Sequence, residues 1–72
     1  MRYGLTEALA DGWREPEASR WVDWRERVNQ QVLLIAGCEI DDLPDYDLAS
    51  AFENGGNVEE VAFDLVREAW DY

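Results

Sequence analysis

The sequence predicts a small all-α domain: a bundle of three main helices, with room for a fourth, short helix at the N-terminus. Apolar residues recur at three- and four-residue spacing over two long segments, while glycine and proline punctuate the chain between them. At 72 residues, of which 47% are hydrophobic and four are tryptophan, the chain is too apolar for a disordered acidic tail. Residues 1–72 therefore form one domain, and a domain this small buries only roughly 60% of its unfolded surface.

The first half of the chain contains a short helix and a long one. Residues Leu5–Ala10 have a short helical pattern that Gly12 ends. A long helix is expected from Pro16 to Ala36, because proline is tolerated in a first turn and Gly37 suits a left-handed C-cap. Its apolar face is interrupted only by Arg25 and comprises Ala18, Trp21, Val28, Val32 and Ile35.

The second half contains a turn and two further helices. Cys38–Asp45 reads as a connection with a tight turn, in which Pro44 disfavours helical angles at the residue before it. Asp45 is then the expected N-cap of a helix over Tyr46–Asn54, which Gly55 and Gly56 end. Asn57 and Glu60 match a capping box that opens the final helix, which runs to about Trp70.

The final helix has more apolar residues than one neighbour can bury. Val58, Val61, Ala62, Leu65 and Ala69 share one face, and Phe63, Val66 and Trp70 extend it sideways. One interpretation is that Phe63 and Trp70 wrap around the core of a small bundle. The other is that they form a surface for a partner or a second copy of the chain.

The charge is large and unevenly distributed. The formal net charge is −11, and residues 41–72 carry ten carboxylates against one base, Arg67, whereas residues 1–40 carry seven against five. The segment 41–72 is therefore an acidic half with a charge of about −9. This is more charge than solubility requires, so it favours either a cationic partner or a saline environment.

Several functional classes are disfavoured by the residues that the chain lacks. It has no histidine, which removes the commonest general base, the histidine-paired nucleophiles and nearly every zinc or copper site. The single cysteine, Cys38, lies among acids that disfavour its thiolate. A calcium loop starting at Asp42 would place Pro44, Tyr46 and Leu48 at ligand positions. We therefore expect no enzyme activity, no cofactor and no metal site.

Membrane insertion and direct nucleic-acid binding are also disfavoured. The longest apolar run, Val32–Ala36, is far shorter than the ~20 residues of a membrane span, so a soluble protein in a reducing compartment is expected. Residues 46–70 have the lengths of a helix-turn-helix, but the second helix is strongly acidic. The arginines of the long helix alternate with acids, which favours intrahelical pairing over a basic surface.

Two binding hypotheses remain. In the first, the acids mimic a nucleic acid and occupy the basic groove of a nucleic-acid-binding protein, because carboxylates three or four positions apart on a helix lie about 5–6 Å apart. The second is an adaptor or dimerisation module, a homodimer included, that binds through apolar side chains. The acidic set is Asp41, Asp42, Asp45, Asp47, Glu60, Asp64, Glu68 and Asp71, and the apolar set is Trp21, Trp24, Phe63, Val66 and Trp70.

Residues 37–69 carry a motif of moderate specificity. Its core is Asp42-Leu43-Pro44-Asp45, then Phe52-Glu53-x-Gly55, then Glu60-Val61-Ala62. This tail resembles that of small acidic proteins of phages and bacteria whose function is unknown, although Glu39 and Asn57 replace the usual capping residues. The resemblance implies a phage or mobile-element setting in the cytoplasm of a bacterial host cell. Small acidic proteins that take over the host or inhibit its defences, such as anti-CRISPR and anti-restriction proteins, are common there.

Overall fold

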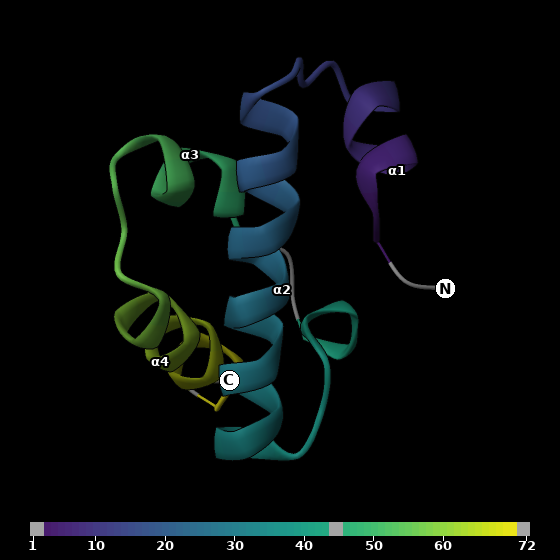
Figure 1. The fold of residues 1–72 in the computed structure, drawn as a ribbon. Helices are drawn as coiled ribbons and strands as arrows, with labels where there is room; N and C mark the ends of the chain where they lie inside the picture. The colour runs from purple at the N-terminus through teal and green to yellow at the C-terminus, as the bar shows by residue number, and fades with distance from the viewer. Residues whose placement is uncertain (1–2, 44–45, 71–72) are drawn as a thin grey trace.

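The fold is a small helical bundle built around one central helix (Figure 1). The computed structural model describes residues 3–43 and 46–70, and within these ranges every regular element is helical. The helices are α1 (Leu5–Ala10), α2 (Glu17–Ala36), α3 (Leu48–Glu53) and α4 (Val58–Trp70), and a 3-10 turn, η1 (Ile40–Asp42), follows α2. The all-α prediction is confirmed, with α2 and α4 as the two long helices.

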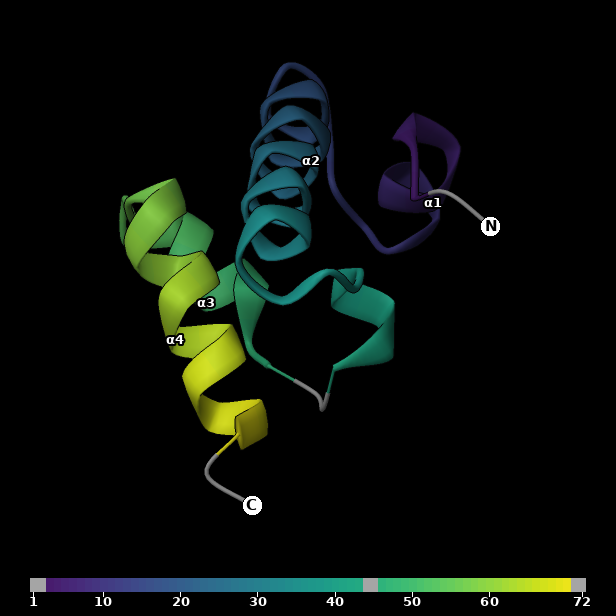
Figure 2. The same cartoon turned by 90° about the horizontal axis from the view of Figure 1, so that it is seen from below.

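Helix α2 is the element on which the others pack. Helix α4 makes its main contact with α2, and α1, α3 and η1 each contact α2 as well. Figures 1 and 2 show α1 and α4 on opposite sides of α2. A short chain with one long helix can thus bury apolar surface on two sides of the same element.

The ends of α2 follow the sequence prediction closely. Pro16 is the N-cap and α2 begins at Glu17, one residue after the predicted start. Gly37 adopts a left-handed conformation with φ of 71°, and its N–H donates to the carbonyl of Leu33. Glycine is suited to this position because it carries no Cβ to clash with the carbonyl of the helix.

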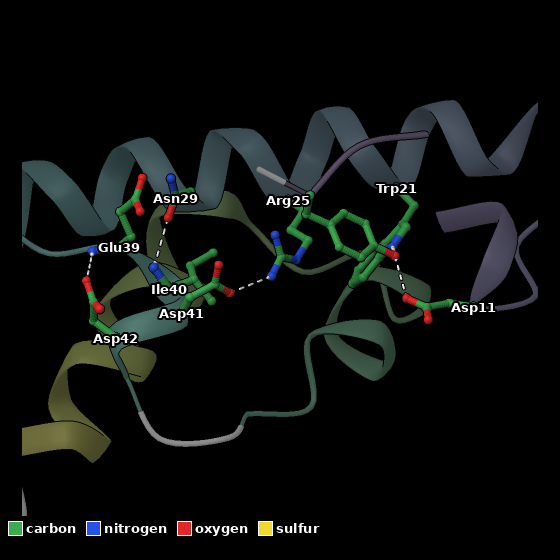
Figure 3. Close-up of polar contacts among 9 residues, drawn as sticks. Asp11, Trp21, Arg25, Asn29, Glu39, Ile40, Asp41 and Asp42 are labelled. Carbon is green, nitrogen blue, oxygen red and sulfur yellow. Dashed lines mark hydrogen bonds and ion pairs between the residues drawn. The ribbon is translucent and has the colours of Figure 1, made fainter. Parts of the chain in front are cut away.

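The connection after α2 contains more structure than a tight turn. Its 3-10 turn buries Ile40, whose N–H donates to the side-chain oxygen of Asn29 on α2 at 2.8 Å (Figure 3). Asp42 closes the turn by accepting from the N–H of Glu39 at 3.3 Å. The bond to Asn29 holds η1 against α2, and it does not follow from the local sequence pattern.

Helix α3 is shorter than predicted and begins later. Its N-cap is Asp47, which accepts from the N–H of Ser50 at 3.1 Å and from the Ser50 hydroxyl at 2.7 Å. The predicted cap, Asp45, lies outside the described residues. The prediction that the helix starts at Tyr46 is wrong because the Asp47–Ser50 pair satisfies the first turn two residues further along.

Helix α4 begins with the predicted cap, Asn57. Asn57 accepts from the N–H of Glu59 at 2.9 Å and from that of Glu60 at 3.3 Å. Asn57 satisfies these two N–H groups at the start of α4.

The core joins α2 and α4 and continues into an aromatic cluster. The aliphatic part includes Val28 and Val32 of α2 and Val61, Leu65 and Val66 of α4, all at least 95% buried. The aromatic cluster is centred on Trp21, which stacks on Trp13 at 4.8 Å and on Trp24 at 5.9 Å between ring centroids. Its other members are Tyr3 and Phe52.

Gly56 joins the aromatic cluster to the turn between α3 and α4. Its carbonyl accepts from the indole Nε1 of Trp24 at 3.1 Å, and its N–H donates to the carbonyl of Ala51 at 2.8 Å. A Cβ added at Gly56 would lie 2.7 Å from the Ala51 carbonyl oxygen and 3.1 Å from Val61 Cγ2. The close approach of these backbone segments therefore requires glycine.

Replacing Gly56 with alanine should destabilise the fold. The added methyl group must displace the Ala51 carbonyl, so we expect the free energy of unfolding to fall by about 1–3 kcal/mol, the usual cost of overpacking. Urea unfolding followed by tryptophan fluorescence measures this change. As a control, Gln30→Ala at an exposed position of α2 should change the free energy by less than about 0.5 kcal/mol, and equal values for the two variants would contradict the packing argument.

Candidate functional site

The predicted acidic residues lie on three elements of the described chain. Asp41 and Asp42 belong to η1, Asp47 caps α3, and the remaining three lie on α4. Asp45 and Asp71 lie outside the described residues. The α4 acids are Glu60, Asp64 and Glu68, which follow one another at four-residue spacing.

Tyr46 marks the place where acids from α3 and α4 come together. Burial raises the pKa of the Tyr46 phenol above its ordinary 10.0, and the nearby charges of Asp64, Glu68 and Asp47 raise it further. Tyr46 and Asp41 also line the same recess, of about 200 Å³, against Leu65 of α4. We call Asp41, Asp47, Asp64 and Glu68, grouped around Tyr46, the acidic face.

Asp41 is positioned by an arginine that crosses from α2. Arg25 Nη2 lies 3.2 Å from Asp41 Oδ1, and the Arg25 side chain is only 19% exposed while that of Asp41 is 64% exposed (Figure 3). The guanidinium carbon of Arg25 also lies 4.3 Å from the centroid of the Tyr3 ring. The prediction that the arginines of α2 pair within the helix is therefore wrong for Arg25, because its stem packs in the apolar stripe and its head reaches η1.

The other arginines with ion pairs in the described chain do pair within their helices. Arg27 Nε lies 3.1 Å from Asp23 on α2, and Arg67 Nη2 lies 3.5 Å from Asp64 on α4. All four side chains are at least half exposed, so each pair contributes little to stability. Arg67 is the one base of the acidic half, and its pairing with Asp64 leaves Glu60 and Glu68 without a cation on α4.

The residues of the predicted apolar set differ in how deeply the structure buries them. Trp21 is 5% exposed and Val66 is 2% exposed, so both belong to the core, and Trp24 is half-buried with its indole bonded to Gly56. Phe63 and Trp70 are 63% and 69% exposed. Of the two interpretations offered for these aromatics, wrapping around the core is wrong, because Val66 takes the place on α2 and leaves Phe63 and Trp70 facing outwards.

Sequence reasoning missed two residues that organise this region. The sequence predicted Tyr46 only as the first residue of a helix. It predicted Arg25 only as an interruption of an apolar stripe. The available signal was the position of Arg25 within an apolar stripe, since an arginine buried there needs a carboxylate partner. Nothing in the sequence places Tyr46 beside α4, because that contact depends on how the chain turns after η1.

The described residues contain no group of three or more Cys, Asp or Glu placed to hold a metal ion. Within the same residues, none of the helices has both the length and the apolar character needed to cross a bilayer. Comparisons of the chain with protein-family models, with curated proteins and with solved structures find no match.

The placement of Tyr46 is testable by titration. In the double variant Asp64→Asn/Glu68→Gln, the pKa of Tyr46 should fall towards 10.0 but stay above it, because burial is the largest cause of the rise. Nuclear magnetic resonance of carbon-labelled tyrosines measures the titration. Tyr3 is the internal control, since its raised pKa is caused by burial and by Asp11, and a Tyr46 value that does not move would contradict the acidic face.

The cap at Asp47 should make stability depend on pH. Hydrogen bonds from the Ser50 side chain and backbone lower the Asp47 pKa below its ordinary 3.8, so its contribution is complete above 3.8 and is lost as the pH falls through the lowered value. Asp47→Ala should therefore unfold at lower urea concentration than wild type at about pH 7, and the difference should shrink as the pH falls below 3.8. Asp47→Asn is the control, because its side-chain oxygen still accepts a hydrogen bond but does not titrate. If the difference in stability between wild type and Asp47→Ala does not change with pH, the Asp47 carboxylate is not the cap of α3.

Proposed function

We propose that this protein is a non-catalytic inhibitor that binds a basic nucleic-acid-binding protein through its acidic face. The observation that supports the proposal is the grouping of Asp41, Asp47, Asp64 and Glu68 around Tyr46. These acids come from three elements, so they present negative charge over a surface and not along a single helix.

The chemistry of the acidic face suits a groove that binds phosphates. Nucleic-acid-binding surfaces gain much of their affinity from arginine and lysine placed against closely spaced negative charges. Carboxylates one helical turn apart, such as Asp64 and Glu68, supply such spacing at about 5–6 Å. A protein that carries −11 overall would also be steered towards a basic surface.

We place the proposed inhibitor in a phage or mobile-element setting, in the cytoplasm of a bacterial host. The resemblance of residues 37–69 to small acidic phage and bacterial proteins motivates this assignment. An anti-CRISPR activity would use such a surface, because CRISPR effectors hold the guide–target duplex in a positively charged channel. An anti-restriction activity would use it where the nuclease binds DNA phosphates with basic residues.

The test is capture from a nuclease-treated bacterial lysate followed by competition with DNA. Immobilised protein should retain a nucleic-acid-binding complex that is lost as salt rises, and the soluble protein should displace a labelled duplex from that complex. The triple variant Glu60→Lys/Asp64→Lys/Glu68→Lys reverses two acids of the acidic face and Glu60, one turn before Asp64. It should lose this activity by at least about 100-fold, because it converts attraction into repulsion.

A charge-matched variant separates the acidic face from total charge. Glu15→Lys/Glu17→Lys/Asp23→Lys changes the net charge by the same amount, but its positions lie before or on α2. It should keep most of the inhibition, and circular dichroism should show both triple variants to be helical. Equal inhibition by the two variants, or no displacement of DNA by the wild type, would overturn the proposal.

An adaptor or dimerisation module is the second candidate function. The exposure of Phe63 and Trp70 favours it, since large aromatic side chains are enriched in protein interfaces. Trp70→Ala should then change the oligomeric state or the affinity for a partner without unfolding the protein. Analytical ultracentrifugation of wild type and variant tests this alternative.

A further inference from the structure

Helix α4 carries a second apolar face that no described part of the chain covers. Phe63 and Trp70 lie seven residues apart, about two turns, and so share one side of the helix. They are 63% and 69% exposed, whereas Val61, Ala62, Leu65 and Val66 of the same helix are buried. Aromatic side chains supply much of the binding energy in protein interfaces, which makes an exposed aromatic pair a candidate anchor.

The charges next to this aromatic pair indicate what can cover it. Glu59 and Glu60 lie one turn before Phe63, and both are exposed. Arg67 lies between Phe63 and Trp70 along the helix, but it pairs with Asp64. The neighbourhood is therefore apolar, with Glu59 and Glu60 at the Phe63 end and the exposed, paired Arg67 between the two aromatics.

A second copy of the chain is a poor occupant for such a face. Two copies would each bring a net charge of −11, and their Glu59 and Glu60 side chains would approach like charges. A partner with basic residues beside apolar ones would instead gain from both features. The spacing of Phe63 and Trp70, about 10 Å along the axis of α4, matches apolar anchors placed two turns apart on a helix.

We propose that the Phe63–Trp70 face binds a basic amphipathic helix of the partner protein. This inference rests on the proposed function and deepens it, because it names the part of α4 that the apolar side chains of the partner contact. The acids speed association by attracting the basic helix, and the aromatic pair slows dissociation by burying its apolar face. The two surfaces thus act on different rate constants.

The experiment uses the full chain and a synthetic peptide pair as probes. One peptide of roughly 18 residues has leucine at helical three-four spacing and lysine or arginine elsewhere, and the other has the same composition in scrambled order. Association and dissociation rates are measured by surface plasmon resonance. The wild type should bind the patterned peptide at least about 10-fold more tightly than the scrambled one.

Variants assign the effect to the aromatic pair. Phe63→Ala/Trp70→Ala should raise the dissociation rate of the patterned peptide by about 10-fold to 100-fold while changing the association rate by less than about threefold. Leu9→Ala is the matched control, because Leu9 is 48% exposed on α1, on the opposite side of α2 from α4 (Figures 1 and 2), and it should bind as wild type does. Circular dichroism checks that both variants are helical.

Three results would overturn the inference. These are equal affinity for the two peptides, an unchanged dissociation rate in the aromatic variant, and a wild-type dimer that Trp70→Ala converts to a monomer. If the dissociation rate is unchanged in the aromatic variant but the patterned peptide associates more slowly with Glu60→Lys/Asp64→Lys/Glu68→Lys, the proposed inhibitor stands and only the role of Phe63 and Trp70 is removed. If that triple variant changes neither the association of the peptide nor the displacement of DNA, the proposed function itself is wrong.

Discussion

The burial of Trp21 between two other tryptophans is the interaction on which the rest of the structure depends. Its indole stacks on Trp13 and on Trp24, and Phe52 of α3 lies 5.4 Å away in a tilted, edge-on arrangement. The Trp21 Nε1 donates to the Tyr3 hydroxyl at 2.9 Å, and that hydroxyl donates to Asp11 at 2.8 Å. One side chain of α2 thus connects the N-terminal segment, the loop before α2 and α3. In a chain of net charge −11, the packing of Trp21 in the aromatic cluster offsets the mutual repulsion of the surface acids.

Polar contacts also hold the N-terminal segment and η1 against α2. Arg25 stacks against Tyr3 and pairs with Asp41, and Asn29 accepts from the N–H of Ile40 one turn further along (Figure 3). Among the described residues, every buried side-chain nitrogen or oxygen has a hydrogen-bond partner. Helix α2 therefore sets both the aliphatic core and the position of η1, and through η1 it sets where Asp41 lies.

This arrangement leaves α4 with different properties on its different sides. The side on α2 is aliphatic and buried, the side towards Tyr46 carries Asp64 and Glu68, and another side carries Phe63 and Trp70. An acidic surface alone would give fast but salt-sensitive binding, and an aromatic surface alone would discriminate little between charged partners. Their presence on one helix supports our proposal of a basic, partly apolar partner.

The sequence by itself determined the helices and most of their ends. The three-four spacing of apolar residues identified α2 and α4, Gly37 ended α2, and Asn57 began α4, because these signals act within one or two turns of the chain. The tertiary structure decided that Val66 is core while Phe63 and Trp70 are exposed, and that Arg25 reaches Asp41. It also brought Tyr46 beside Asp64 and Glu68. These outcomes depend on which side of one helix meets another, and helical periodicity specifies an apolar side without specifying the neighbour that covers it.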